Sequence, residues 1–301
     1  MPLSNTATDP PDEWTISRVL RFATEDFQKR RPASPRLDAE LLLGEVLGLD
    51  RVQLLVQSTR VLTSSELSRY RESIQRRRSG EPVAYILGRR EFFGRSFAVD
   101  RRVLVPRPET EILVEVALRR TQHRHLSGRA VDMCTGSGCV AISFALARRT
   151  WQVTATDVSE DALALAQRNA TALGAVWGVD FRAGDLYAAL PSASRFELIV
   201  SNPPYIPSAE LSSLMADVRD FEPALALDGG ADGLSFYRRL AERADKHLVP
   251  GGVLAVEVGA GQAGAVAELF ARAGLVDGDV DRDFAGHERV VSARRGAGTR
   301  S

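Results

Sequence analysis

The sequence predicts an α/β protein in which a parallel sheet follows a small helical domain. From Pro106 onward, short apolar runs alternate with helical patterns, as in sheets built from strand–helix–strand units. Residues 14–80 instead carry apolar side chains at helical spacing. The length of 301 residues is enough for one large and one smaller domain. We expect a helical domain over residues 1–81, a β-hairpin linker over 82–105, a sheet domain over 106–296 and a tail over 297–301.

The predicted helical domain carries its own start and stop signals. Ser34 and Pro35 form an N-cap followed by proline at the first helical position. Thr63 and Glu66 have the spacing of a capping box, in which each residue satisfies a backbone N–H near the other. The run 76–78 is all arginine and suits the negative end of a helix dipole. Several short helices are therefore expected here.

The remaining elements follow from a change of period after residue 81. Phenylalanine and valine residues around the turn signal Gly94 predict a β-hairpin within 82–105. Later apolar runs predict strands over residues 130–133, 153–157, 179–183, 198–201 and 253–258. Helical patterns predict helices near 140–147, 159–173, 234–248 and 263–273. Gly174, the pair Pro250-Gly251 and Gly274 mark where three of these helices stop.

The composition excludes several classes of protein. A formal net charge of zero provides no overall field toward nucleic acid or an anionic membrane. Two cysteines, Cys134 and Cys139, are too few for a disulfide framework and suggest a reducing compartment. Residues 1–13 lack the apolar core of a signal peptide, and no apolar run approaches the roughly 18 residues of a membrane span. We expect a cytoplasmic protein with no membrane partner and no metal site.

A glycine-containing loop, residues 132–138, joins the first predicted strand of the sheet to the next helix. Gly136 and Gly138 allow a tight turn and a close approach of the backbone to a ligand. Asp157 ends the following strand, 157 − 138 = 19 positions after Gly138. A carboxylate at that strand end can accept hydrogen bonds from both ribose hydroxyls of a nucleoside. The loop therefore predicts a nucleoside-containing cofactor.

The loop alone leaves two cofactor classes open. Gly136, Gly138 and Ala141 also satisfy the dinucleotide-binding pattern of dehydrogenases. Asp132, however, would repel a pyrophosphate, whereas through water it could hold the ammonium end of S-adenosylmethionine. Asp185 ends the third predicted strand and is placed to accept from an adenine amino group. These two acids favour S-adenosylmethionine.

The segment Ser201-Asn202-Pro203-Pro204-Tyr205 points to the reaction. It follows the fourth predicted strand, and the carboxyl ends of parallel strands meet at one ligand-binding edge. An amide or aromatic amine nitrogen is a poor nucleophile because its lone pair is delocalised. The Asn202 oxygen and the Pro203 carbonyl can each accept one N–H and so orient that lone pair. Pro204 stiffens the loop and Tyr205 offers a flat wall, so we expect methyl transfer to a planar NH₂ group, driven by positioning.

With these motifs in place, the chain resembles the HemK/PrmC family, the protein-(glutamine-N5) methyltransferases of peptide-chain release factors. The blocks that carry the resemblance are 84–88 (Ala-Tyr-Ile-Leu-Gly), 105–111 (Val-Pro-Arg-Pro-Glu-Thr-Glu), 132–138 and 201–205. The resemblance implies a Rossmann-like, seven-stranded S-adenosylmethionine-dependent methyltransferase domain with an antiparallel strand near its end, here 290–293. It further implies cofactor contacts at Cys134, Thr135, Gly136, Ser137, Gly138, Asp157, Leu186 and Asn202.

The resemblance also implies the substrate. Residues 202–205 would grip the glutamine of the Gly-Gly-Gln motif of class I release factors, and the helical domain would help to dock that protein. One departure is Cys134, where many members have glycine. Cysteine can replace glycine there if the backbone does not need a positive φ, so we expect it to be tolerated. With no neighbouring base to activate it, Cys134 is not expected to be catalytic.

Three other functions remain open from the residues themselves. The same planar-NH₂ chemistry serves adenine-N6 methylation of nucleic acid, although neutral net charge and the lack of a basic aromatic stripe oppose it. The same glutamine chemistry could act on a ribosomal protein. A third possibility is a catalytically silent cofactor-binding module, which the intact Asn202–Tyr205 motif opposes. We expect no direct binding of nucleic acid.

Overall fold

The computed structural model describes residues 13–29, 34–123 and 127–297, which fall into two compact units, Met1–Gly88 and Arg89–Ser301. The predicted tail over 297–301 and the polar segment before residue 13 lie almost wholly outside the described residues. The predicted linker over 82–105 is divided between the two units, since the boundary falls after Gly88. Among the described residues, no helix has the length and the apolar character needed to span a membrane.

The first unit is helical, as predicted. Thr63 and Glu66 form the expected capping box, and Ser34 is the N-cap of its helix, although its side chain makes no capping bond. The Tyr70 hydroxyl donates to the carbonyl of Ala39 at 3.1 Å within the buried core of this unit. The helices of the unit are α1 (Ile16–Gln28), α2 (Pro35–Leu47), α3 (Arg51–Val56), α4 (Ser64–Arg78) and α5 (Val83–Leu87).

The short helix α5 corrects the prediction that a hairpin begins near residue 82. Pro82 is its N-cap, and Gly88 ends it in the left-handed region at φ 69°. Proline before the first turn and glycine after the last are a helix boundary pair. The buried side chains of Ala84 and Tyr85 lie on this turn. The hairpin starts only after Gly88, with β1 (Arg89–Phe92) and β2 (Arg95–Ala98).

The hairpin belongs to the second unit and is held there in two ways. Phe92 and Phe97 are fully buried in the core of that unit, with ring centroids 6.0 Å apart in an edge-to-face arrangement. Asn169 bonds the backbone of Ala98 from both ends of its amide: Oδ1 accepts from the N–H at 2.8 Å, and Nδ2 donates to the carbonyl at 3.1 Å. The same Nδ2 donates to the carbonyl of Ser137 at 2.9 Å. Asn169 therefore ties the hairpin to the glycine loop.

The sheet of the second unit has seven strands in the order β5-β4-β3-β6-β7-β9-β8. β9 pairs antiparallel with β7, which confirms the antiparallel strand expected over 290–293. The strands are β3 (Arg129–Met133), β4 (Gln152–Asp157), β5 (Val179–Ala183), β6 (Phe196–Ser201), β7 (Leu248–Glu257), β8 (Leu275–Arg282) and β9 (Glu288–Arg295). The α-helices are α6 (Glu111–Arg120), α7 (Cys139–Ala147), α8 (Glu160–Ala172), α9 (Ala216–Arg219), α10 (Ser235–His247) and α11 (Ala263–Arg272). Short 3₁₀ turns are η1 (Pro108–Thr110), η2 (Leu186–Ala189), η3 (Ser208–Ser213) and η4 (Ala224–Ala226).

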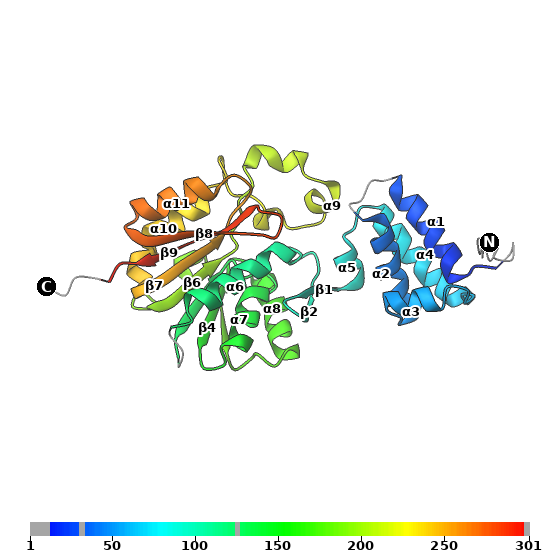
Figure 1. Ribbon diagram of the computed structural model, residues 1–301, viewed down its shortest axis with the longest axis horizontal. Coiled ribbons are helices and arrows are strands. Elements are labelled where there is room, and N and C mark those ends of the chain that lie inside the picture. The colour runs from blue at the N-terminus through cyan, green and yellow to red at the C-terminus, as the bar shows by residue number, and fades with distance from the viewer. Residues whose placement is uncertain (1–12, 30–33, 124–126, 298–301) are drawn as a thin grey trace, which may run out of the picture. The chain divides into compact units, whose positions relative to one another are not determined.

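Each face of the sheet has its own apolar core. Helices α6, α7 and α8 cover one face, and α10 and α11 cover the other (Figure 1). Along β3, Ala130 belongs to the first core, whereas Val131 and Met133 belong to the second. Strands buried on both faces read as continuous apolar runs, which is why the central strands β3 and β6 could be predicted from sequence.

Strand β8 was not among the predicted strands. Its sequence alternates aspartate with other residues and contains Gly278, so it has no apolar run. It lies at the open edge of the sheet, with a neighbouring strand on one side only, and its register with β9 shifts between Val276 and Asp279. Charged residues and bulges are common at such edges.

Candidate functional site

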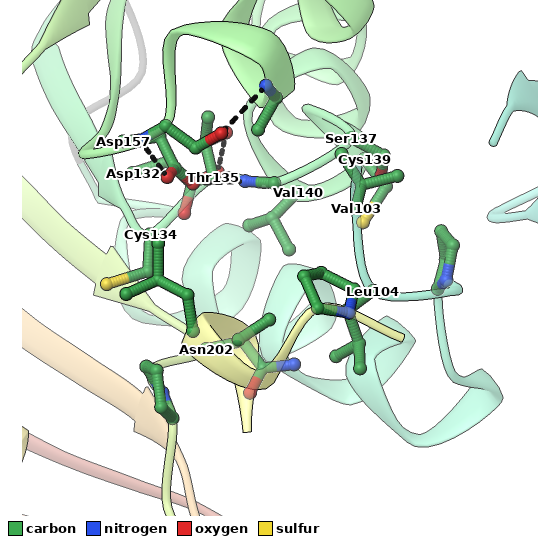
Figure 2. A pocket seen from close by; sticks show the side chains of 18 of the residues that line it. Val103, Leu104, Asp132, Cys134, Thr135, Ser137, Cys139, Val140, Asp157 and Asn202 are labelled. Atoms are coloured by element: carbon green, nitrogen blue, oxygen red, sulfur yellow. Dashed lines mark hydrogen bonds between the residues drawn. The ribbon is translucent and has the colours of Figure 1, made fainter. Parts of the chain in front are cut away.

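One cavity lies at the carboxyl ends of β3, β4 and β6 and encloses about 900 Å³, counting its open mouth. It brings together the glycine loop, Asp157 and the start of the Asn202–Tyr205 segment, as expected for ligand sites on parallel sheets. In the view of Figure 2, Asp132, Thr135 and Asp157 gather at the top and Asn202 lies at the bottom. The predicted site residues that line this cavity are Asp132, Cys134, Thr135, Gly136, Ser137, Asp157, Asn202 and Pro204.

The glycine loop owes its shape to residues in the left-handed region. Gly136 has φ 54° and Gly138 has φ 80°. A Cβ on Gly138 would lie 2.9 Å from Cδ1 of Ile142 and 3.0 Å from Cβ of Ala166, so glycine also permits the close approach of α8. Gly138 itself does not line the cavity. Its role is to let α7 begin directly beneath the loop.

Cys134 does not meet the condition under which cysteine was expected to be tolerated. Its φ is 59°, in the left-handed region where a side chain is strained. The position therefore favours glycine, and Cys134 stores backbone strain at the cavity wall. Burial raises the pKa of its thiol, and the nearby Asp157 raises it further. The thiol is thus held protonated, as expected for a residue with no catalytic role.

Asp157 holds the turn of the loop and keeps capacity for a ligand. Its Oδ2 accepts from the N–H of Gly136 at 2.9 Å, and its Oδ1 accepts from the N–H of Ser159 at 2.9 Å. Each carboxylate oxygen has a second lone pair, so both can still accept from ribose hydroxyls. Burial raises the pKa of Asp157, and its backbone hydrogen bonds oppose that effect.

Asp132 lies deeper, at the carboxyl end of β3. Its Oδ2 accepts from the Thr135 hydroxyl at 2.6 Å and from the N–H of Ala141 at 3.2 Å, in the first turn of α7. Burial raises the pKa of Asp132 to about 7, while these hydrogen bonds lower it. A cation in the cavity would stabilise the charged form of this carboxyl. The position suits a ligand with a positive end.

Asn202 meets Thr110 at the edge of the cavity. Its Nδ2 donates to the Thr110 hydroxyl oxygen at 3.2 Å, so its amide oxygen is the end available for a ligand. Thr110 ends η1 and is buried. It lies in the Pro-Arg-Pro-Glu-Thr-Glu block, yet sequence reasoning gave it no role. The block contains the residue, but the contact is visible only after folding because 92 positions separate the partners.

The other residues of the Asn202–Tyr205 segment differ in whether they line the cavity. Pro204 lines the cavity, whereas Pro203 and Tyr205 do not. The carbonyl of Tyr205 accepts from Nε2 of Gln262 at 2.9 Å, and Gly229 approaches its backbone too closely to allow a Cβ. Burial raises the pKa of the Tyr205 phenol to about 12, so this hydroxyl stays protonated. The hydrogen bond from Gln262 and the close approach of Gly229 therefore hold the Tyr205 backbone in place.

Asp185 and Leu186 lie away from the cavity. Asp185 is exposed and pairs with Arg239 at 2.5 Å, and Leu186 is buried in the core beneath α10. Arg239 occupies only Oδ2 of Asp185, so the other oxygen of this carboxylate could still accept from an adenine amino group.

An ion pair that sequence reasoning missed closes another part of the wall. Nη2 of Arg107 donates to both carboxylate oxygens of Glu222, at 2.9 and 2.7 Å. The Glu222 side chain is 1% exposed, and burial raises its pKa to about 7 against the effect of Arg107. The pair joins two segments that both line the cavity, one containing Pro106 and the other Pro223. No sequence signal identifies Glu222, which lies in an irregular region.

Over residues 13–29, 34–123 and 127–297, no group of three or more histidine, cysteine, aspartate or glutamate side chains could hold a metal ion. The two cysteines, Cys134 and Cys139, are free thiols.

Comparisons with known proteins identify relatives over most of the chain. The model of the PrmC N-terminal domain matches residues 18–88, and that of the methyltransferase small domain matches residues 108–218. The release factor glutamine methyltransferase of Geobacter sulfurreducens is 44% identical over 289 residues, 96% of this chain and 100% of that protein. The proteins of the same description from Bradyrhizobium diazoefficiens and Bordetella pertussis are 44% and 45% identical, over 96% and 86% of this chain and 97% and 94% of their own lengths.

A solved structure shows the same architecture. A methyltransferase from Pyrococcus furiosus aligns with a TM-score of 0.52 at 21% identity, covering 68% of this chain and 91% of that one. At that identity the likeness concerns the fold.

Proposed function

This chain belongs to the family of release factor glutamine methyltransferases, and on that premise we propose that it methylates the glutamine of the Gly-Gly-Gln motif of class I release factors. The methyl group goes from S-adenosylmethionine to the side-chain amide nitrogen, N5. The observation that carries the proposal is the orientation of the Asn202 amide. Its NH₂ donates to the Thr110 hydroxyl, so its oxygen is available to accept from a substrate N–H.

The cavity suits the cofactor. S-adenosylmethionine supplies an electrophilic methyl group on a positively charged sulfur. Asp132 and Asp157 provide negative charge at one side of the cavity, and the loop from Cys134 to Gly138 brings the backbone close. Val158 and Ala162 follow Asp157 in the lining and offer apolar surface for a nucleoside base.

The residues at the other side orient the nucleophile. The Asn202 oxygen accepts one N–H of the glutamine amide. Pro203 does not line the cavity, so its backbone carbonyl would have to turn toward the substrate to accept the other N–H and direct the nitrogen lone pair at the methyl carbon. As that lone pair forms the new N–C bond, the S–C bond electrons return to sulfur and one amide proton leaves to solvent. No strong base is needed, since the nitrogen becomes acidic as it attacks. Pro204 limits how far this segment can move.

The first unit, Met1–Gly88, is proposed to help dock the release factor, and it coincides closely with the matched PrmC N-terminal domain. We also propose that the enzyme works in the cytoplasm, where release factors act. The formal net charge of zero supports the absence of direct nucleic-acid binding. A binding constant that stays low and changes little with salt would agree with that proposal.

The test is transfer of labelled methyl from S-adenosylmethionine to a purified class I release factor. A release factor whose Gly-Gly-Gln glutamine is changed to alanine is the matched control. We expect label on the first protein only, mapped to that glutamine by mass spectrometry. Label on neither protein, with the cofactor still bound, would contradict the proposed target and favour a ribosomal protein or an RNA adenine. Label on both would place the reaction at another residue.

A further inference from the structure

Glu257 is a buried carboxyl at the active edge of the sheet that the proposed reaction does not use. It ends β7, and its neighbour Val256 pairs with Ser201 at the end of β6. Asn202 and Glu257 are the next residues along these two strands, so they lie at neighbouring positions on the same edge of the sheet. Glu257 is 3% exposed, and its Oε2 has no hydrogen-bond partner among the residues that the structure describes. A buried charge without full pairing is costly to keep and calls for an explanation.

Thr110 lies between these two side chains. Burial raises the pKa of Glu257 to about 7, and a hydrogen bond from Thr110 acts in the opposite direction. The same hydroxyl oxygen accepts from Nδ2 of Asn202 at 3.2 Å. A threonine hydroxyl has one hydrogen to donate and two lone pairs that accept. Once its hydrogen is donated to Glu257, the hydroxyl can only accept from Asn202.

We propose that Thr110 and Glu257 are positioning residues that fix which end of the Asn202 amide faces the cavity. This inference rests on the proposed function, because it assigns the orientation that glutamine methylation needs. An asparagine amide has a donor end and an acceptor end of nearly the same shape. If Thr110 could donate to Asn202, the amide could turn over and present its NH₂ to the substrate NH₂. Two donors cannot bond each other, so the turned amide could not orient the nucleophile.

Other charged and titratable groups also act on Glu257 and bear on its ionisation. Glu109 opposes the charged form, whereas Arg107 and Arg289 favour it. Within the described part of the chain, Glu257 in turn raises the pKa of Tyr205, Tyr237 and Cys139. None of these three is expected to ionise near neutral pH, since burial raises the pKa of each. If Glu257 lost its charge, the Thr110 hydroxyl would no longer be held as a donor to Glu257. It could then donate to the Asn202 amide, so the orientation of that amide would no longer be fixed.

Kinetics of three variants test this. Thr110→Val removes the hydroxyl at nearly constant shape, Thr110→Ser keeps it, and Glu257→Gln removes the charge at constant shape. We expect Thr110→Val and Glu257→Gln to lower kcat on the order of 10-fold, with the dissociation constant of S-adenosylmethionine changed less than about 2-fold. Thr110→Ser should keep most of the wild-type kcat. A Thr110→Val enzyme with wild-type kcat would overturn the inference.

The pH profile distinguishes positioning from simple packing. In the wild type, kcat should fall as the pH drops through about 7, where Glu257 takes up a proton. In Glu257→Gln, the part of this fall in kcat that comes from Glu257 should be lost. Any fall at low pH that remains in the variant belongs to other groups such as Asp132. If Glu257→Gln kept both the rate and the full acid limb, Glu257 would be a packing residue only.

A readout without substrate separates this inference from the proposed function. The chain has three asparagines, Asn5, Asn169 and Asn202, so ¹⁵N-asparagine labelling gives three side-chain NH₂ signals. Asn202→Asp removes one signal and so assigns it. We expect a nuclear Overhauser effect between the Asn202 NH₂ and the Thr110 methyl at pH 8, weakened in Glu257→Gln. If this contact is absent, the inference fails even where the wild type methylates a release factor. If it is present in a wild type without turnover, the proposed function fails alone.

Discussion

At the residue scale, the chemistry depends on the amide oxygen of Asn202. This oxygen is free to accept a substrate N–H because the amino end is bound to Thr110. We predict that Asn202→Ala lowers the methylation rate on the order of 10²-fold or more, through loss of the orienting acceptor. Cofactor affinity should fall less than the rate. Single-turnover assays and calorimetry measure the two, and near-wild-type turnover would contradict the mechanism.

Asp157 makes a separate prediction for binding. Replacement by alanine removes the carboxylate that holds Gly136 and can accept from ribose hydroxyls. We expect Asp157→Ala to weaken S-adenosylmethionine binding by roughly 1–3 kcal/mol, through lost charge-assisted hydrogen bonds. Isothermal titration calorimetry measures the dissociation constant. Asp157→Asn keeps the shape and one acceptor but turns its NH₂ toward the N–H of Gly136 or of Ser159, so it should lose affinity as well.

The strained backbone at Cys134 predicts a stabilising substitution. At φ 59°, glycine avoids the steric cost that any side chain meets. We expect Cys134→Gly to raise the free energy of unfolding by roughly 1 kcal/mol, since relief of strain outweighs the greater freedom of glycine in the unfolded chain. Cys134→Ala keeps a Cβ and is the matched control, for which no such gain is expected. Urea denaturation compares the two, and equal stabilities would show that the position carries no strain.

At the element scale, Asn169 joins three parts of the second unit. From α8 it bonds the backbone of Ala98 in the hairpin and the carbonyl of Ser137 in the glycine loop. We predict that Asn169→Ala lowers the free energy of unfolding by about 2–4 kcal/mol, since the buried carbonyl of Ser137 and the part-buried backbone groups of Ala98 lose their partner. Cofactor affinity should fall as well, because the loop loses an anchor. Denaturation and calorimetry on one preparation test both effects, whereas a change in neither would show that water replaces the amide.

The elements that could be predicted from sequence are those with a local cause. The central parallel strands β3 and β6 are buried on both faces and therefore read as apolar runs, and the Thr63–Glu66 capping box is a matter of spacing. Helix α5 was missed because five residues are too few to show a helical period. β8 was missed because an edge strand needs no apolar run. The glycine loop and Asn202 could be found from motif spacing, whereas the Arg107–Glu222 pair and the Thr110–Asn202 contact join residues 115 and 92 positions apart.

At the scale of the whole molecule, three buried carboxyls make stability depend on pH. Burial raises the pKa of Asp132, Glu222 and Glu257 to about 7 in each case. Because the folded state holds these protons more tightly than the unfolded state, their contribution to stability is fully present below about pH 4 and is lost as the pH rises through about 7. His247, whose pKa is lowered by burial, acts in the opposite direction up to its ordinary value of 6.5.

We therefore predict that the cofactor-free protein has a higher melting temperature at pH 6 than at pH 8. As the pH rises over this range, the stability lost through the three carboxyls exceeds the stability gained through the single histidine. Scanning calorimetry across these pH values measures the effect. Glu257→Gln removes one of the three groups, so its melting temperature should depend less steeply on pH. An equal slope in both proteins would show that Glu257 does not titrate in this range.

The edge strand β8 has a further consequence for the molecule in solution. A sheet edge offers unpaired N–H and C=O groups on which a second copy could add a strand and begin to aggregate. Here Asp277, Asp279 and Asp281 alternate along β8, and the register of β8 with β9 shifts between Val276 and Asp279. Arg294 donates to Asp277 at 3.1 Å, and Arg119 donates to Asp281 at 2.6 Å, so the edge carries exposed ion pairs. Charged side chains and an interrupted register both disfavour the addition of a second strand. Because salt screens exposed charges, high ionic strength would weaken this protection and remove a barrier to self-association.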